Sequence, residues 1–142
     1  MGISVGGTIT GLQAEIHFNP VQLTSSTVTA AVDANTINTD NDSRDEHLKE
    51  QDFFDVAHYP KISLKSISFK HKSGNNYSGQ FDLTIKGKTK TIEMPFSFSE
   101  MGKSVILKGS FKINRLDFGV GDTSLILSND VTINIETELD KL

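Results

Sequence analysis

Apolar and polar residues alternate with a period of two through most of this 142-residue chain. In residues 14–18, for example, three apolar side chains are separated by Glu15 and His17. Period two places alternate side chains on opposite faces of a strand, and one polar face is typical of antiparallel sheets. The sequence therefore predicts an all-β fold. The apolar sets of the later strands are Tyr77, Phe81, Leu83 and Ile85; Ile92, Met94, Phe96 and Phe98; Val105, Leu107, Phe111 and Ile113; Val131, Ile133, Ile135 and Leu139.

Short polar segments separate these sets. "SGNN", "KGK", "SEMGK" and "SND" carry the Gly, Asn and Asp that permit tight reversals, so residues 62–70 and the four strands after them are expected to form an antiparallel meander. The apolar parity flips within residues 62–70, which predicts a β-bulge near Lys65 and Ser66. Pro95 has no N–H to donate, so we expect it at an edge or bulge of its strand.

The length of the expected strands favours a barrel over a sandwich. Strands near ten residues suit a tilted barrel wall, and closing the sheet removes exposed edges. We therefore expect one extended antiparallel β-barrel. A chain of 142 residues is most economically one core, so residues 1–142 are expected to form a single domain.

The stretch "SRDEHLKEQDFFDVAHYP", residues 43–60, carries the only helical signal. Ser43 and Glu46 form a capping box that predicts the start of a short helix. Asp52 is expected to cap a second turn, which Pro60 ends. We expect one short helical segment between early strands, with its aromatic residues packed against the sheet.

The same stretch concentrates residue types that bind zinc or manganese. His47 and His58 are eleven residues apart, however, whereas ligands on one helical face need spacings of three or four. We interpret the charges as solvated, and keep a metal-dependent hydrolase using His47 and the aspartates as an alternative. The candidate ligands of that alternative are Asp45, His47, Asp52, Asp55 and His58.

No nucleophile motif supports catalysis. No Gly-x-Ser-x-Gly elbow precedes a helix, and the chain contains no cysteine. We therefore expect a protein that is not an enzyme and needs no cofactor. A net charge of −4 without a basic stripe argues against a nucleic-acid partner. No apolar run is long enough for a membrane-spanning helix, and "MGISVGG" lacks the order of a secretory signal.

Arg44 and Arg115 are the only arginines, and each lies within two residues of an aspartate, Asp45 and Asp117. One interpretation makes them structural ion-pair anchors. The other makes one of them a ligand for an anionic or phenolic head group, which the guanidinium fork suits.

Nine phenylalanines are expected to point largely into the barrel. An eight-stranded barrel is just wide enough to be filled by side chains or to hold one elongated apolar ligand. The small residues on the inward face leave volume that either Phe and Leu or a ligand must fill. Those small residues are Ala14, Ala30, Gly79 and Gly109.

Three stretches of the sequence resemble the YceI family of lipocalin-like, polyisoprenoid-binding proteins. They are "RDEHLKEQDFFDVAHYPKISL", "LTIKGKTKTIEMPF" and "INRLDFGVG". The resemblance runs from about Gly2 to the C-terminus. It implies an extended eight-stranded antiparallel barrel around a long apolar tunnel for an isoprenoid chain, and no catalytic residues. Its most specific residues are Arg44, Asp45, His47, Leu48, Phe53, Phe54, Asp55, Tyr59 and Pro60.

The family pattern has a strand before the Gly-Ile-Ser motif, whereas this sequence begins at Met1 just before it. We therefore expect the family's first strand to be missing, residues 3–18 to form the second strand with a kink near Gly11, and the barrel to be open beside the last strand. An open edge invites pairing, so a homodimer is a hypothesis. The resemblance also implies a periplasmic location.

These observations predict a non-catalytic carrier that transports an isoprenoid or similar long-chain amphiphile inside the barrel. A structural or interaction protein with a filled barrel is the alternative. The expected wall residues are Phe81, Leu83, Phe96, Phe98, Leu107, Phe111, Ile133 and Ile135. The expected plug consists of Phe53, Phe54 and Tyr59, and the head-group candidates are Arg44, His47 and Arg115.

Overall fold

A computed structural model describes residues 6–121 and 128–140 of the chain. Within them a seven-stranded antiparallel sheet follows the chain order, so the predicted all-β fold is confirmed. The strands are β1 (Gln13–His17), β2 (Thr27–Asp33), β3 (Lys61–Ser73), β4 (Asn76–Ile85), β5 (Lys88–Met101), β6 (Ser104–Asn114) and β7 (Asp130–Asp140). The helices are α1 (Asp42–Leu48) and the short 3-10 helices η1 (Leu23–Ser25), η2 (Ala34–Thr36) and η3 (Arg115–Phe118).

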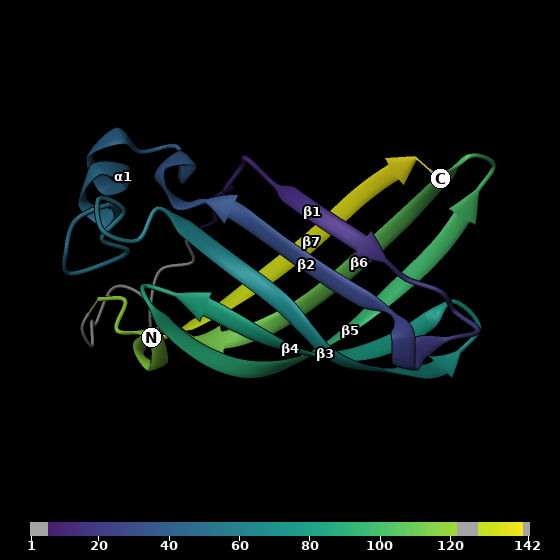
Figure 1. Cartoon of the computed structure of the whole chain (residues 1–142). Helices are drawn as coiled ribbons and strands as arrows, with labels where there is room; N and C mark the ends of the chain where they lie inside the picture. Colours follow the sequence, from purple (N-terminus) through teal and green to yellow (C-terminus); the bar gives the residue numbers. More distant parts are fainter. Residues whose placement is uncertain (1–5, 122–127, 141–142) are drawn as a thin grey trace.

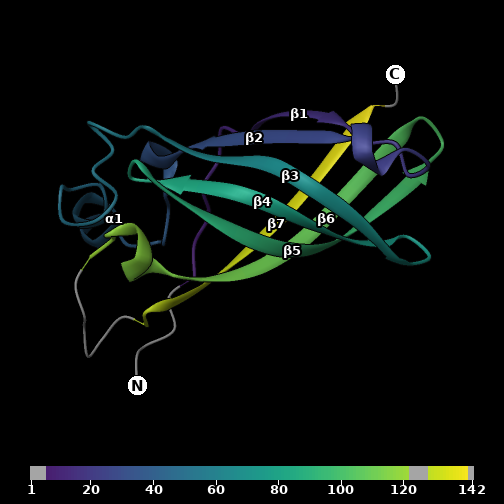
Figure 2. The same cartoon turned by 60° about the horizontal axis from the view of Figure 1, so that its bottom comes forward.

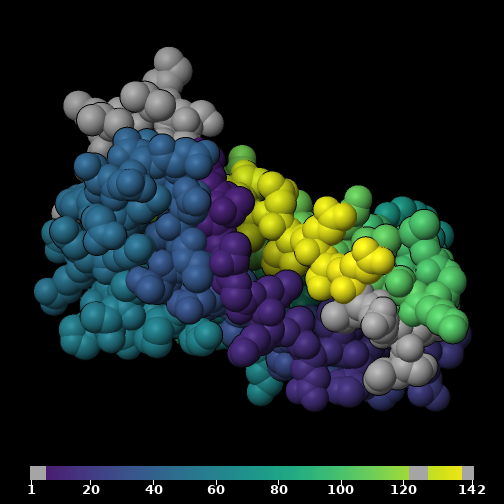
Figure 3. All heavy atoms as spheres, turned by 90° about the horizontal axis from the view of Figure 1, so that it is seen from above, coloured from purple at the N-terminus to yellow at the C-terminus, as the bar shows by residue number. Residues whose placement is uncertain are grey.

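The sheet curls into a half-barrel that is open along one side (Figures 1 and 2). In the described residues no strand pairs with the outer edge of β1 or of β7, although the two strands lie side by side in Figure 3. We call the opening between them the seam. An opening beside the last strand was expected, and Gly11 has the expected kink, with φ of 76°. The strand expected over residues 3–18 is shorter than predicted: β1 covers residues 13–17, residues 6–12 contain only the isolated bridge of Thr8 with Asn38, and residues 3–5 lie outside the described residues.

The strand connections separate the two ends of the half-barrel. One end, the lid end, carries residues 34–60 with α1, the β4–β5 turn and η3 (Figure 1). We call residues 34–60 the lid segment. The other end, the turn end, carries η1 and the short β3–β4 and β5–β6 connections. The meander of β3 to β7 is confirmed, and so is the helical segment between early strands.

Two local irregularities of the sheet were predicted, and both lie close to their predicted positions. The register of β3 against β4 shifts between Ser66 and Ser68, so the extra residue of the bulge is Ile67. Pro95 lies opposite Ser78 of β4, inside β5, whereas the pairing of β5 with β6 begins only at Phe96. Pro95 therefore marks the point where β5 loses its neighbour on one side, which makes the strand locally an edge.

Two predictions for the lid segment are wrong in detail. The helix cap is Asn41, whose side chain accepts from the Arg44 N–H at 3.0 Å, so Ser43 lies inside α1. Asparagine caps at least as well as serine, and Asn41 has the extended backbone that a cap requires. The second helical turn expected at Asp52 is replaced by successive turns, because Asp55 adopts a left-handed φ of 50° that a helix cannot continue through.

Two apolar clusters fill the concave side of the sheet. The cluster nearer the lid end consists of Val28, Leu64, Phe81, Leu83, Ile85, Met94, Phe111, Ile113, Phe118 and Val120. The cluster nearer the turn end consists of Tyr77, Phe96, Phe98 and Leu107, with Ile16, Phe18, Leu23, Phe69 and Val105 packed against it.

Candidate functional site

The expected wall residues all belong to one of these clusters or pack against it. Phe81, Leu83 and Phe111 are buried in the lid-end cluster, and the partly buried Ile133 and Ile135 pack against it. The turn-end cluster contains the other three, which are Phe96, Phe98 and Leu107. The alternation of the strands thus brings the eight side chains to one apolar inner face.

Two of the small inward residues, Gly79 and Gly109, leave space that neighbouring side chains fill. A Cβ at Gly79 would lie 2.5 Å from Cε1 of Phe81, and a Cβ at Gly109 would lie 2.6 Å from the Met94 sulfur. Phe81 and Met94 are only 1% and 2% exposed. In the central part of the half-barrel these two glycines therefore accommodate large core side chains.

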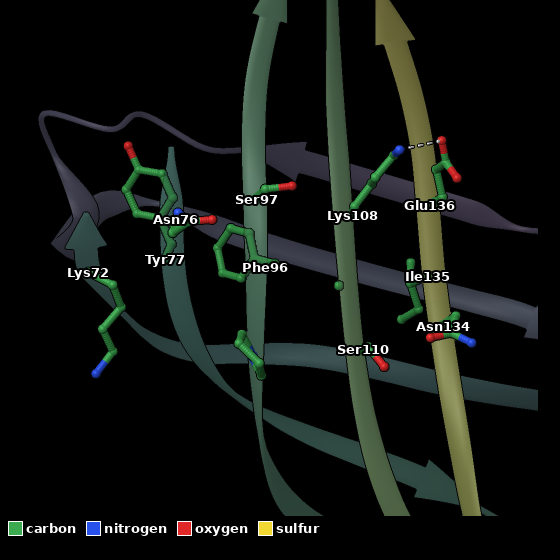
Figure 4. Close-up of a pocket in the computed structure, with 12 residues that line it drawn as sticks. Lys72, Asn76, Tyr77, Phe96, Ser97, Lys108, Ser110, Asn134, Ile135 and Glu136 are labelled. Atoms are coloured by element: carbon green, nitrogen blue, oxygen red, sulfur yellow. Dashed lines mark ion pairs between the residues drawn. The ribbon is translucent and has the colours of Figure 1, made fainter. Parts of the chain in front are cut away.

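Two cavities stand out on the described surface, and both are open to solvent. The larger, of about 780 Å³, spans β4 to β7 (Figure 4). Its polar lining residues, such as Ser97, Lys108 and Glu136, occupy the outward positions of their strands. This cavity is an open depression whose charged rim lies on the outside of the sheet, where Lys108 and Glu136 form an ion pair at 3.5 Å. It differs from the long apolar tunnel that the family resemblance implies.

The apolar inner face continues to the seam, where it is incompletely buried. Ile16 on β1 and Ile133 and Ile135 on β7 have intermediate exposure. Towards the lid end Leu12 is 41% exposed and Val131 is 37% exposed. Both unpaired edges of the sheet therefore present apolar side chains that residues 6–121 and 128–140 cover only in part.

Arg44 holds the beginning of the lid segment together. Its Nε donates to Thr39 Oγ1 at 2.8 Å and its NH2 group donates to the Thr39 carbonyl oxygen at 2.7 Å. Thr39 in turn donates to the buried Asp45 carboxylate through its backbone N–H at 3.0 Å. The two charged residues meet at Thr39, and the described side chains form no ion pair between Arg44 and Asp45.

Arg115 is 6% exposed and fixes the segment after η3. Its guanidinium donates to the carbonyl oxygens of Ser128 and Val120 at 3.0 and 2.8 Å, and to Asn129 Oδ1 at 3.3 Å. Both arginines therefore serve as structural anchors, although through backbone carbonyls rather than the expected neighbouring aspartates. The hydrogen bonds of each guanidinium fix its position within its own chain.

The remaining candidates lie on the lid segment. His47 is exposed, and its Nδ1 lies 3.3 Å from Glu50 Oε2. The ring centroids of His47 and Phe53 are 4.9 Å apart. Phe53 and Phe54 pack on the lid-end cluster, as expected of a plug. Tyr59 is 40% exposed, so it lies at the surface of this end.

The histidines and aspartates of the lid segment do not converge. His58 Nδ1 lies 2.8 Å from Asp55 Oδ1, and in residues 6–121 and 128–140 no three His, Asp or Glu side chains are grouped as metal ligands would be. In the same part of the chain no helix is long and apolar enough to cross a membrane.

The sequence interpretation missed Lys86 and Lys88. Together with Gln51, Asp55, Tyr59 and Gly119 they line the smaller cavity, of about 240 Å³, at the lid end. We call it the mouth pocket. In the sequence the two lysines were visible only as a "KGK" turn, and nothing local indicates that η3 and the lid segment return to that turn.

Comparisons with known proteins agree with this geometry. The family model of the YceI-like domain matches residues 1–139. A UPF0312 protein of Pseudomonas syringae pv. tomato is 28% identical over 90% of this chain and 71% of its own length. Protein YceI of Escherichia coli is 25% identical over 93% of this chain and 72% of its own length.

Solved structures show the same fold. The crystal structure of the YCEI protein of Campylobacter jejuni superimposes with a TM-score of 0.89 at 26% identity, covering 100% of this chain and 88% of that one. A polyisoprenoid binding domain from Saccharophagus degradans superimposes with a TM-score of 0.66 at 12% identity, covering 82% of this chain and 77% of that one. At that identity the second likeness concerns the fold alone.

Proposed function

Because the chain belongs to the family of YceI-like domains, we propose that it is a non-catalytic carrier that binds a long-chain amphiphile such as an isoprenoid. The observation that carries the proposal is the apolar strip along the seam, where Ile16, Ile133 and Ile135 remain partly exposed. The proposal extends to transport in the periplasm, and family membership is its support there. The description of the Saccharophagus degradans domain as polyisoprenoid binding supports the ligand class.

An apolar chain suits the seam for two physical reasons. Covering the exposed apolar side chains would contribute roughly 25 cal/mol per Å². A hydrocarbon chain also needs no hydrogen bonds, whereas any other occupant would have to satisfy its own polar groups there. The strands lining the seam supply side chains at every second position, so a chain lying along it would contact Ile133 and Ile135 in succession.

Native mass spectrometry of the purified protein, before and after extraction with organic solvent, tests the proposal. We expect a bound mass of a few hundred daltons that extraction removes, and uptake of farnesol by the extracted protein. Ile133→Glu should reduce the uptake because it puts a charge on the inner face. Thr132→Glu on the outer face of the same strand is the matched control and should leave uptake unchanged.

A protein that carries no extractable mass and takes up no farnesol would contradict the carrier. It would favour the second candidate, a structural or interaction protein with a filled barrel. The specific observation for that candidate is the complete burial of Phe81, Met94 and Phe118 in the lid-end cluster. Such a protein would pair through the open edges of β1 and β7, and sedimentation at increasing protein concentration would show a homodimer.

A further inference from the structure

The mouth pocket brings together three segments that are distant in the sequence. Gln51, Asp55 and Tyr59 come from the lid segment, Lys86 and Lys88 from the β4–β5 turn, and Gly119 follows η3. From this arrangement we propose that the pocket binds an oxyanion of the phosphate type. The inference rests on the proposed carrier function, since the oxyanion would be the head group of the bound amphiphile.

Both lysine ammonium groups lie at Gly119. Lys86 Nζ donates to the Gly119 carbonyl oxygen at 2.9 Å, and a Cβ at Gly119 would lie 2.9 Å from Lys88 Nζ. Neither lysine forms an ion pair with any other described side chain. Two neighbouring ammonium groups repel each other, and an anion between them would relieve that repulsion. Lysine is an established phosphate ligand as a point charge, so the pair favours a compact, highly charged oxyanion.

The backbone of the turn is unusual for a lysine. Lys86 and Gly87 have φ of 53° and 74°, as both central residues of a tight type I′ hairpin turn require. Asn, Asp or Gly ordinarily occupies the first of these positions, because a longer side chain is strained there. From this position Lys86 Nζ reaches the Gly119 carbonyl oxygen, so the strained residue keeps a cation in the pocket lining. Strain of this kind is concentrated at ligand sites.

The other lining groups are compatible with an anion. The Tyr59 ring packs on the turn, since a Cβ at Gly87 would lie 2.8 Å from its Cε1 atom. Tyr59 and Gln51 are exposed and can donate from a hydroxyl and an amide. Asp55 is the only acidic side chain among the lining residues, and its Oδ1 lies 2.8 Å from His58 Nδ1. The pocket therefore combines two cations and two neutral donors with one carboxylate that already has a partner.

The size of the pocket suits the head group of an amphiphile and not its hydrocarbon chain. Its volume of about 240 Å³ is below the roughly 300 to 1,000 Å³ of sites for drug-sized ligands. It can hold a phosphate or diphosphate, but a long hydrocarbon must lie elsewhere. None of the head-group candidates from the sequence, Arg44, His47 and Arg115, is among the residues that line this pocket, whose cations are Lys86 and Lys88.

Equilibrium binding of farnesyl phosphate and of farnesol by the full chain tests the inference. For the wild type we expect farnesyl phosphate to bind about tenfold more tightly, as one charge-assisted interaction would give. Lys88→Gln should abolish that preference without changing the affinity for farnesol. Lys90→Gln, on the same strand and outside the pocket lining, should keep it. Lys88 is exposed, so its substitution should not affect folding, which thermal unfolding verifies.

A titration with inorganic pyrophosphate, followed by amide chemical shifts, separates the sources of the anion. Chemical-shift changes at Lys86, Lys88 and Gly119 that Lys88→Gln removes would support an oxyanion site. They would support it even if neither farnesyl compound binds, a result that would contradict only the carrier function. Equal affinity for both farnesyl compounds, with no pyrophosphate shifts at these residues, would overturn the site and leave the carrier standing. Tighter binding of farnesyl phosphate that survives Lys88→Gln would also overturn it.

Discussion

The two ends of the half-barrel are closed by different kinds of interaction. The turn end is sealed by aromatic rings around Phe18, whose ring centroid lies 4.8 to 5.6 Å from those of four other aromatic residues. The lid end is closed by long connections held by polar contacts of Arg44, Asp45 and Arg115. Apolar packing contributes across the whole contact area, whereas each polar anchor acts at one point.

The difference indicates which end can accommodate a ligand. Loss of the aromatic cluster would expose a large apolar surface, so the turn end is expected to stay closed. At the lid end the turns of residues 50–59 pack on the core mainly through Phe53 and Phe54. Local opening is least costly where few buried apolar contacts are lost. The mouth pocket lies at that end, which fits a route for an amphiphile.

The largest expected effect is at the turn end. Phe18→Ala should lower the free energy of unfolding by about 3 kcal/mol, because it removes a ring packed against Phe69, Tyr77, Phe96 and Phe98. Urea denaturation measures it. Val21→Ala, at a residue that is 87% exposed in the same connection, is the control and should change stability by less than about 0.5 kcal/mol. A similar small change for both variants would contradict the aromatic seal.

The next effect is at the polar anchor of the lid end. Arg115→Ala should cost about 2 kcal/mol, because it leaves carbonyl oxygens of Ser128 and Val120 without their donor. Hydrogen exchange should show faster exchange at Gly119 and Val120 than at the central strands. If exchange instead rises uniformly over the sheet, the anchor does not act locally and the contrast between the two ends is lost.

The helix cap gives a smaller effect. Asn41→Ala should destabilise the protein by about 1 kcal/mol because it removes the acceptor for the Arg44 N–H. Ser43→Ala tests the cap position expected from the sequence and should have little effect, since Ser43 lies within α1. Urea denaturation of the two variants distinguishes the two cap positions. A larger loss of unfolding free energy for Ser43→Ala than for Asn41→Ala would support the capping box predicted from the sequence.

The smallest effect is expected on the outside of the sheet, at neither end. Lys108→Ala breaks an exposed ion pair with Glu136 and should change stability by less than about 0.5 kcal/mol. Binding of farnesol should also be unchanged, because Lys108 occupies an outward position. Reduced farnesol binding by Lys108→Ala would indicate that the outer depression of Figure 4 takes part in binding.

Features that depend on neighbouring residues followed from the sequence. The alternation around Phe81 and Leu83 predicted both the strand and its buried face, and the flipped parity predicted a bulge at Ile67 to within one residue. The cap was misplaced by two residues, because Asn41 and Ser43 are both good capping residues and only the backbone selects between them. Such errors are small because the governing interactions span a few residues.

The candidate site was harder to predict. Strand periodicity placed the expected wall residues on one inner face, whereas no local signal indicated that Arg44 and Arg115 donate to backbone carbonyls. Lys86 and Lys88 were overlooked because their importance depends on Gly119, more than thirty residues further along the chain.

The sequence by itself determined the all-β class, the order of the strands and the apolar inner face, because strand periodicity and turn residues are local properties. Only the tertiary structure decided that Phe81 and Met94 occupy the space left by Gly79 and Gly109, that the two arginines anchor backbone carbonyls, and that two lysines meet at Gly119. These features depend on which distant segments come into contact, and contact requires the curvature of the whole sheet.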